Sequence, residues 1–196
     1  MATEVELKVR VDDIEPVKER LSAIGSYCRS CRKSDSYWLS PKGPEVRVRR
    51  EQGVEADGAA YESAVVTFKS KTISGGIEVN DEREFTVSNA ALFEELLDSL
   101  GMSKTIQKEK TGWAWSIRVA AGQAQESPAA AQLPILAEVM LVKGLGWFLE
   151  IEIVCPDNCG QAVGESRKRL LALLAELGIP AERIESRPYT QMLAAL

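Results

Sequence analysis

The amino-acid sequence predicts an α+β protein: a closed, mainly antiparallel eight-stranded β tunnel with helices packed outside it. Its first strand, Glu4-Val5-Glu6-Leu7-Lys8, alternates strictly between charged and apolar residues, which places three charges on one face. The same alternation returns in Val46-Arg47-Val48-Arg49 and in Leu149-Glu150-Ile151-Glu152. A sheet that closes around such faces encloses a polar lumen.

Eight strand-like segments are bounded by turn-forming residues and show alternation or apolar runs. They are expected at residues 3–11, 34–39, 45–50, 64–71, 77–87, 103–119, 136–142 and 147–154. No linker rich in Pro, Gly or Ser marks a domain boundary. We therefore expect residues 1–196 to form a single domain.

Three helices are indicated by apolar residues at helical spacing, by capping residues and by terminal glycines. They are expected from Asp12 or Asp13 to Gly25, from Ser88 to Gly101, and from near Asp157 to Gly178. The Ala-, Gln- and Pro-rich stretch 120–134 has neither periodicity nor bulky residues. We interpret that stretch as a mobile loop without a function.

The composition indicates which binding partners are unfavourable for this chain. The formal net charge is −5 and the sequence pI is about 5.1, so the overall field does not favour nucleic acid or an anionic membrane surface. No apolar run approaches the roughly 18 residues of a spanning helix, and the N-terminus lacks the pattern of a signal peptide. We expect a cytoplasmic protein, and the sequence leaves open whether it is a homodimer.

The chain contains no histidine, which removes the commonest general base and transition-metal ligand. Chemistry near neutral pH must then rest on carboxylates, lysines or a hard cation such as Mg²⁺ or Mn²⁺. Cys28, Cys31, Cys155 and Cys159 form two pairs that a zinc site could use. The wide separation and loose second spacing favour free thiols over zinc.

Several motifs together resemble those of the CYTH superfamily of triphosphate tunnel metalloenzymes, over nearly the whole chain. The first strand is similar to the family's E-x-E-x-K strand, and Val46-Arg47-Val48-Arg49 to its paired-arginine strand. Thr67-Phe68-Lys69 resembles its lysine strand. The segment 144–152, GLGWFLEIE, resembles the G-L-G-x-F-x-E-I-E segment of the cyclase-like branch.

Three positions depart from the family pattern. The acidic residue expected before G-L-G falls on Met140, and Glu138, two residues earlier on the same strand face, is the plausible substitute. The K-x-R pattern is replaced by Lys108-Glu109-Lys110, which keeps the charge but loses the arginine fork. Arg187-Pro188-Tyr189 is a weak match to a basic-x-Tyr ending.

The resemblance implies a metal-assisted triphosphate site. The phosphate-binding residues are expected to be Lys8, Arg47, Arg49, Lys69, Lys108, Lys110 and Arg187. The metal ligands are expected to be Glu4, Glu6, Glu138, Glu150 and Glu152. Glu82 and Glu84 are open between a role in the site and a surface charge run. Physically, a triphosphate needs both cationic side chains and metal, and carboxylates on the same faces imply divalent cations between them and the phosphates.

The leading functional hypothesis is hydrolysis of inorganic triphosphate, thiamine triphosphate or a nucleoside triphosphate, with Lys8 as the catalytic residue nearest the reacting phosphate. The alternative enzyme is a class IV adenylyl cyclase, which converts ATP to cyclic AMP and pyrophosphate. A third hypothesis is a non-catalytic polyphosphate- or nucleotide-binding module, because binding needs less exact geometry than catalysis. The sequence does not separate the two enzymes, since both need the same contacts.

Overall fold

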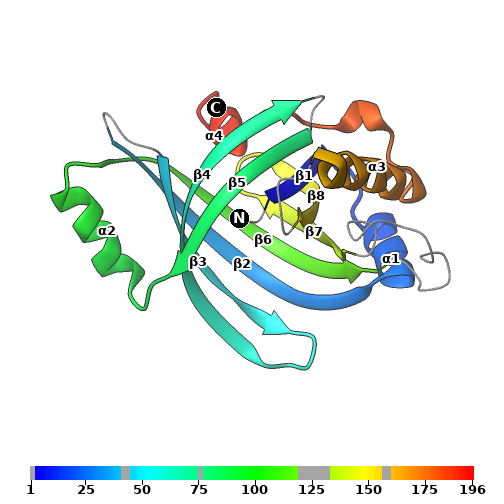
Figure 1. Ribbon diagram of the computed structural model, residues 1–196. Helices are drawn as coiled ribbons and strands as arrows, with labels where there is room; N and C mark the ends of the chain where they lie inside the picture. Colours follow the sequence, from blue (N-terminus) through cyan, green and yellow to red (C-terminus); the bar gives the residue numbers. More distant parts are fainter. Residues whose placement is uncertain (1–2, 41–44, 75–76, 119–132, 156–159) are drawn as a thin grey trace.

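The computed structural model describes residues 3–40, 45–74, 77–118, 133–155 and 160–196 (Figure 1). The strands are β1 (Thr3–Arg10), β2 (Ser26–Leu39), β3 (Glu45–Glu55), β4 (Ala60–Ser74), β5 (Ile77–Thr86), β6 (Ser103–Ile117), β7 (Ile135–Val142) and β8 (Gly146–Cys155). The helices are α1 (Glu15–Ile24), α2 (Ala90–Ser99), α3 (Gly160–Glu176), α4 (Tyr189–Leu193) and the 3₁₀ helix η3 (Ala181–Arg183).

The eight strands form one strongly curled antiparallel sheet in the order β1-β5-β4-β3-β2-β6-β7-β8. The α+β class and the antiparallel sheet are as predicted, whereas the predicted closure is met only in part. β1 pairs with β8 over its whole length and with β5 through only four residue pairs, between Thr3–Glu6 and Glu78–Asp81. Beyond these four pairs, the C-terminal segment, and not β5, pairs with this edge of β1. Ile184 bridges Val9, and the Glu185 N–H donates to the Lys8 carbonyl oxygen (2.9 Å).

Several strands are longer than their sequence patterns indicate. β2 begins at Ser26 rather than at residue 34, β3 continues to Glu55, and β4 starts at Ala60. The added residues are mostly polar or glycine, so they carry little apolar alternation. Pairing along both sides of β2, with β3 and with β6, keeps them extended.

The main core lies between the outer face of the sheet and the helices at one end of it. Val5, Leu7 and Val9 of β1 are fully buried, and they share a cluster with Leu170 and Leu174 of α3. Figure 1 shows α1 and α3 at this end and α2 at the opposite end. The apolar face of β1 therefore points outward to the helices, which turns its charged face into the interior of the curl.

The first helix start agrees with the expected caps and the second differs by one residue. Before α1, Ile14 already has helical backbone angles, and the Asp13 side chain accepts a hydrogen bond from the Glu15 N–H (3.2 Å), as an N-cap does. Asn89, and not Ser88, caps α2, because its side chain accepts a hydrogen bond from the Leu92 N–H (3.0 Å). The expected start of the third helix near Asp157 and most of stretch 120–134 lie outside the described residues.

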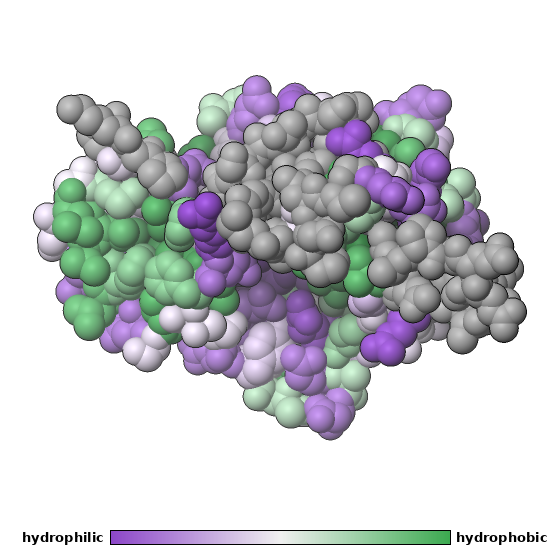
Figure 2. All heavy atoms as spheres, viewed as in Figure 1, coloured by the Kyte–Doolittle hydropathy of each residue, from purple (hydrophilic) through white to green (hydrophobic). Residues whose placement is uncertain are grey.

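Two features were not expected. η3 and α4 follow α3 near the C-terminus. Hydrophobic side chains remain exposed over α2, at the left of Figure 2. Within the described ranges, no helix combines the length and the apolar character needed to cross a membrane.

Candidate active site

The curled sheet encloses a cavity of about 580 Å³ with a mostly charged lining. Eleven of the fourteen site residues expected from the sequence line this cavity. They are Glu4, Glu6, Lys8, Arg47, Arg49, Glu84, Lys108, Lys110, Glu138, Glu150 and Glu152. The interior therefore combines anionic and cationic side chains, as the alternating strands predict.

Strand register brings the two Glu-x-Glu motifs face to face. In the antiparallel pair of β1 and β8, Glu6 lies opposite Glu152, and Lys8 lies opposite Glu150. Directly opposite residues project from the same face of a sheet. The first and last strands thus supply one continuous acidic and basic wall.

Three carboxylates of this wall form a cluster. One oxygen each from Glu4, Glu6 and Glu152 lie within 4.8 Å of one another. Burial, reinforced by the charges of Glu138 and Glu150, raises the pKa of Glu152. Carboxylates gathered in this way repel one another unless a cation or a proton lies between them. Oxygen ligands suit Mg²⁺ and Mn²⁺, so the cluster fits the hard cation expected from the sequence.

The other two expected metal ligands have different partners. The Lys33 ammonium donates to both carboxylate oxygens of Glu138, at 2.6 and 2.8 Å. Lys110 donates to Glu150 (2.6 Å), and the Tyr189 hydroxyl donates to its other oxygen (2.6 Å). Although burial opposes the effect, the lysine charges lower the pKa of Glu150 to about 2 and also lower that of Glu138. The structure therefore divides the five expected ligands into a carboxylate cluster and two lysine-bound carboxylates.

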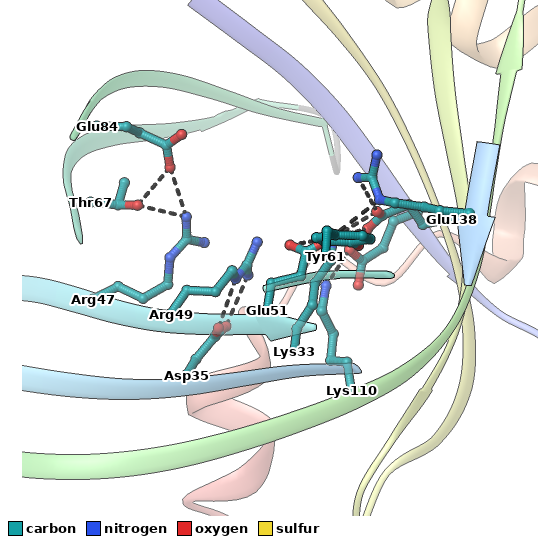
Figure 3. A network of polar contacts seen from close by, with 12 residues as sticks. Lys33, Asp35, Arg47, Arg49, Glu51, Tyr61, Thr67, Glu84, Lys110 and Glu138 are labelled. Atoms are coloured by element: carbon teal, nitrogen blue, oxygen red, sulfur yellow. Dashed lines mark hydrogen bonds and ion pairs between the residues drawn. The ribbon is translucent and has the colours of Figure 1, made fainter. Parts of the chain in front are cut away.

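Lys8, Arg47, Arg49, Lys108 and Lys110 form the cationic wall of the cavity. A buried carboxylate that was not expected from the sequence binds two of these side chains. Asp35 of β2 accepts two hydrogen bonds from Arg49, at 2.7 and 2.9 Å, and lies 3.0 Å from the Lys108 ammonium. Burial would raise the pKa of Asp35, but Arg49 and Lys108 hold it well below its usual range. Asp35 thus fixes the direction of two cations that line the cavity. Figure 3 shows its contact with Arg49.

Arg47 and its contacts form the neighbouring part of the wall. Its guanidinium donates to the Thr67 hydroxyl oxygen (2.8 Å) and to Glu84 (3.1 Å), and Thr67 donates to the same carboxylate (2.6 Å). Figure 3 shows Arg47 beside Arg49, while Lys33 and Glu138 lie farther along the interior. Glu84 therefore belongs to the site region, in contact with an arginine.

Three lysines converge on one aromatic ring. The ammonium groups of Lys8, Lys108 and Lys110 lie 5.4, 5.1 and 5.6 Å from the centre of the Tyr189 ring. Burial, followed by the charge of Glu150, raises the pKa of the Tyr189 hydroxyl well above its usual value, which keeps it a hydrogen-bond donor. Converging ammonium groups create a region of positive potential suited to phosphate oxygens.

Three expected residues are not placed in this lining. The side chains of Lys69 and Glu82 lie outside the described part of the structure. Arg187 is half exposed, and its guanidinium binds Glu185 at 2.8 and 2.6 Å. Two residues later, Tyr189 lines the cavity in its place.

The sequence analysis missed several lining residues on β2 and β3. They are Arg29, Lys33, Tyr37, Glu45 and Glu51, and Asp35 lies on the same face of β2 as Lys33 and Tyr37. The signal was present as the alternation Lys33-x-Asp35-x-Tyr37, which resembles that of the first strand. The expected strand began at residue 34, and so its charged face was overlooked.

The cysteines take no part in the candidate metal cluster. Cys28 is partly exposed, Cys31 and Cys155 are buried, and all three are free thiols. Cys155 contacts the Ser166 hydroxyl at 3.3 Å. Cys159 lies outside the described residues. Within the described ranges, the only group of ligands close enough for a metal is the glutamate cluster, which favours the free-thiol interpretation.

Comparison with known proteins identifies relatives through the fold alone. No protein-family model and no curated protein sequence matches the chain. PH1819 from Pyrococcus horikoshii superposes with a TM-score of 0.77 at 23% identity, covering 98% of both chains. A candidate adenylate cyclase from Vibrio parahaemolyticus has a TM-score of 0.70 at 17% identity and covers 97% of both.

A third similar structure is HpAC1 from Hippeastrum, described as a candidate adenylyl cyclase with a dominant triphosphatase activity. Its TM-score is 0.58 at 15% identity, and the match covers 95% of this chain and 91% of HpAC1. Likeness at these identities establishes the fold. This fold agrees with the resemblance to the triphosphate tunnel metalloenzymes that the sequence motifs indicate.

Proposed function

We propose that the protein is a divalent-metal-dependent hydrolase of a triphosphate compound. One observation carries the proposal: a single cavity holds the carboxylate cluster of Glu4, Glu6 and Glu152 together with converging lysines and arginines. A triphosphate carries about four negative charges, which lysines and arginines can bind directly, whereas carboxylates in the same cavity need a divalent cation between them and the phosphates. The two kinds together fit a metal–triphosphate complex.

The side chains suggest a division of roles. Lys8, Lys108 and Lys110 converge where phosphate oxygens can bind, and Arg47 and Arg49 extend this cationic surface. The carboxylate cluster would hold Mg²⁺ or Mn²⁺, which when bound supplies charge neutralisation and polarises phosphoryl oxygens. Lys8, which is 3% exposed, is our choice for the residue that orients or activates the nucleophile.

The described lining favours hydrolysis over cyclisation of ATP. A cyclase must hold adenine and ribose as well as the phosphates, and base recognition usually uses stacking and apolar surfaces. Both tyrosines in the lining are at most 8% exposed and bind charged groups, because Tyr37 accepts from Lys108 (2.9 Å) and Tyr189 donates to Glu150. The remaining apolar lining in the described ranges is Leu136, Val154 and Pro188. This surface favours a substrate with a small organic group or none, such as inorganic triphosphate.

The similar structures support the same class of chemistry. HpAC1 combines a cyclase description with a dominant triphosphatase activity, and the Vibrio protein is described as a candidate cyclase. Cyclase activity is therefore the second candidate. Both activities use a bound triphosphate, so the assay must resolve their products.

The test is a panel of inorganic triphosphate, thiamine triphosphate and ATP, each with Mg²⁺ and with Mn²⁺. Orthophosphate, pyrophosphate and cyclic AMP are measured separately. We expect metal-dependent orthophosphate release, fastest from inorganic triphosphate. Cyclic AMP with stoichiometric pyrophosphate would instead establish the cyclase.

Two variants connect any activity to this cavity. Glu6→Gln should lose metal-dependent turnover, whereas Glu19→Gln, on the exposed surface of α1, should behave as the unmodified protein. Tight binding of triphosphate without turnover of any substrate would support the binding module and refute the enzyme. Activity that survives Glu6→Gln at limiting metal would contradict the assignment of this cluster.

A further inference from the structure

The Tyr189 side chain is held in two ways inside the cavity. Its hydroxyl donates to a Glu150 oxygen (2.6 Å), and its ring packs against Phe148 in an edge-to-face arrangement with centroids 5.0 Å apart. Tyr189 is 7% exposed, although it belongs to the short helix α4 near the C-terminus. Because the hydroxyl and the ring both have a partner, the fold sets the direction in which the ring faces.

Ammonium groups from two strands meet at this ring. Lys8 of β1 and Lys108 and Lys110 of β6 lie 5.4, 5.1 and 5.6 Å from its centre, within the roughly 6 Å of a cation–π contact. β1 and β6 are not neighbours in the sheet, so no strand pairing between them aligns these lysines. A single ring from the C-terminal segment therefore contacts cations that the sheet itself does not bring into register.

The ring attracts the lysines without adding a negative charge. Asp35 lies 3.0 Å from the Lys108 ammonium, and Glu150 accepts from Lys110 (2.6 Å), so carboxylates already offset part of the positive charge. An aromatic face attracts ammonium groups through its quadrupole and carries no net charge. A further carboxylate in place of the ring would also attract the lysines, but it would cancel charge that a phosphate needs.

We propose that Tyr189 is a positioning residue for triphosphate binding. Its ring gathers Lys8, Lys108 and Lys110 into one anion-binding group and leaves their charge available to phosphate oxygens. Its hydroxyl holds the ring in place through Glu150. The inference rests on the proposed function, because it takes a triphosphate as the ligand of the cavity.

The alternative role of Tyr189 is to anchor α4, since the residue also packs in a cluster with Val142, Phe148 and Met192. Substitutions at this one position separate the two roles. Tyr189→Phe keeps the ring and loses the hydroxyl. Tyr189→Leu and Tyr189→Met keep an apolar side chain in the cluster and lose the ring, and the use of two such variants allows for one that does not fold.

The test is isothermal titration calorimetry with inorganic triphosphate and with orthophosphate, both in the presence of Mg²⁺. Tyr189→Phe should bind triphosphate within about threefold of the unmodified protein, whereas the ringless variants should bind it at least about tenfold more weakly. Orthophosphate has fewer oxygens to contact the lysines, so its affinity should fall by a smaller factor. Leu174→Ala, in the main core on α3, is the control for a general loss of stability, and its triphosphate affinity should be unchanged. Circular dichroism and the melting temperature check the fold of each variant.

The outcomes separate this inference from the proposed function. Triphosphate affinity that is unchanged in the ringless variants would overturn the positioning role. Equal losses in Tyr189→Phe and the ringless variants would assign the effect to the hydroxyl and overturn it as well, as would equal losses for triphosphate and orthophosphate. An unmodified chain that does not bind triphosphate with Mg²⁺ would refute the proposed function itself, and this inference with it.

Discussion

Replacing Asp35 by Asn tests whether one buried carboxylate maintains the cationic wall of the cavity. Asp35 is 1% exposed and contacts Arg49 twice and Lys108 once, at 2.7 to 3.0 Å. Asparagine has nearly the same volume but no negative charge. The substitution therefore leaves Arg49 and Lys108 close together without the charge that compensates them.

The expected loss of stability is large. Removing one partner of a buried ion pair costs about 3–5 kcal/mol, and a protein of this size loses about 2–4 °C in melting temperature per kcal/mol. We expect the melting temperature of Asp35→Asn to fall by about 6–20 °C. The control is Glu109→Gln, whose exposed carboxylate pairs with Arg32 and Lys143 on the surface and should leave the melting temperature unchanged.

Ligand and pH distinguish this electrostatic effect from a packing defect. Tripolyphosphate supplies negative charge to the same cations, so it should raise the melting temperature of Asp35→Asn more than that of the unmodified protein. The pKa of Asp35 is lowered in the fold, so its contribution to stability is complete above the ordinary aspartate pKa and is lost as the pH falls through the lowered value. Below about pH 4, Asp35→Asn should therefore lose less stability on acidification than the unmodified protein. Equal melting temperatures for Asp35→Asn and the unmodified protein, or equal stabilisation by tripolyphosphate, would refute this reasoning.

Three further substitutions test the site. Glu152→Gln should reduce turnover at limiting Mg²⁺ by at least about 100-fold, whereas Glu19→Gln should have no effect. Turnover is measured as phosphate release over a metal titration. Partial rescue by excess metal would agree with a weakened metal site, and equal rates for the two variants would contradict the assignment. Arg47→Ala should weaken binding of triphosphate more than of monophosphate by about tenfold in calorimetry, because an arginine addresses the additional phosphate groups; equal losses would indicate a structural role. In Lys8→Arg, the arginine keeps the positive charge but cannot give up its proton. Normal triphosphate binding with loss of turnover would support proton transfer by Lys8, whereas retained turnover would mean that Lys8 supplies charge alone.

The inward-facing wall of β1 and β8 could be predicted because its signal is local. Alternation along one strand decides which side chains share a face, and Val5 and Leu7 must face the helices. Alternation therefore places Glu4, Glu6 and Glu152 on inward faces, whereas their contact depends on the register of β1 and β8. The same reasoning fails for β2, where few apolar residues alternate with Lys33 and Asp35.

The partners of each charged residue could not be predicted, because they depend on register between strands far apart in sequence. Lys33 and Glu138 are separated by 105 residues, and their contact requires β2, β6 and β7 to pair in one alignment. A similar limit applies near the C-terminus. The motif around Arg187 marked the correct segment, but the turn before α4 directs Tyr189 inward and leaves Arg187 with Glu185.

The cavity contains lysine-bound carboxylates and a separate carboxylate cluster, and the two differ in their effect on the binding of a polyanion. Glu138 and Glu150 are each bound to a lysine, so their main effect is to fix Lys33 and Lys110 in a buried site without a net excess of charge. Oxygens of Glu4, Glu6 and Glu152 lie close to one another, and three neighbouring carboxylates favour a cation or a proton between them. Under the proposed function, we expect a metal-free triphosphate to be repelled by the carboxylate cluster and attracted by the other cations of the lining, such as Lys8 and Arg49. A metal that offsets the cluster would then make a metal–triphosphate complex bind better than either component alone.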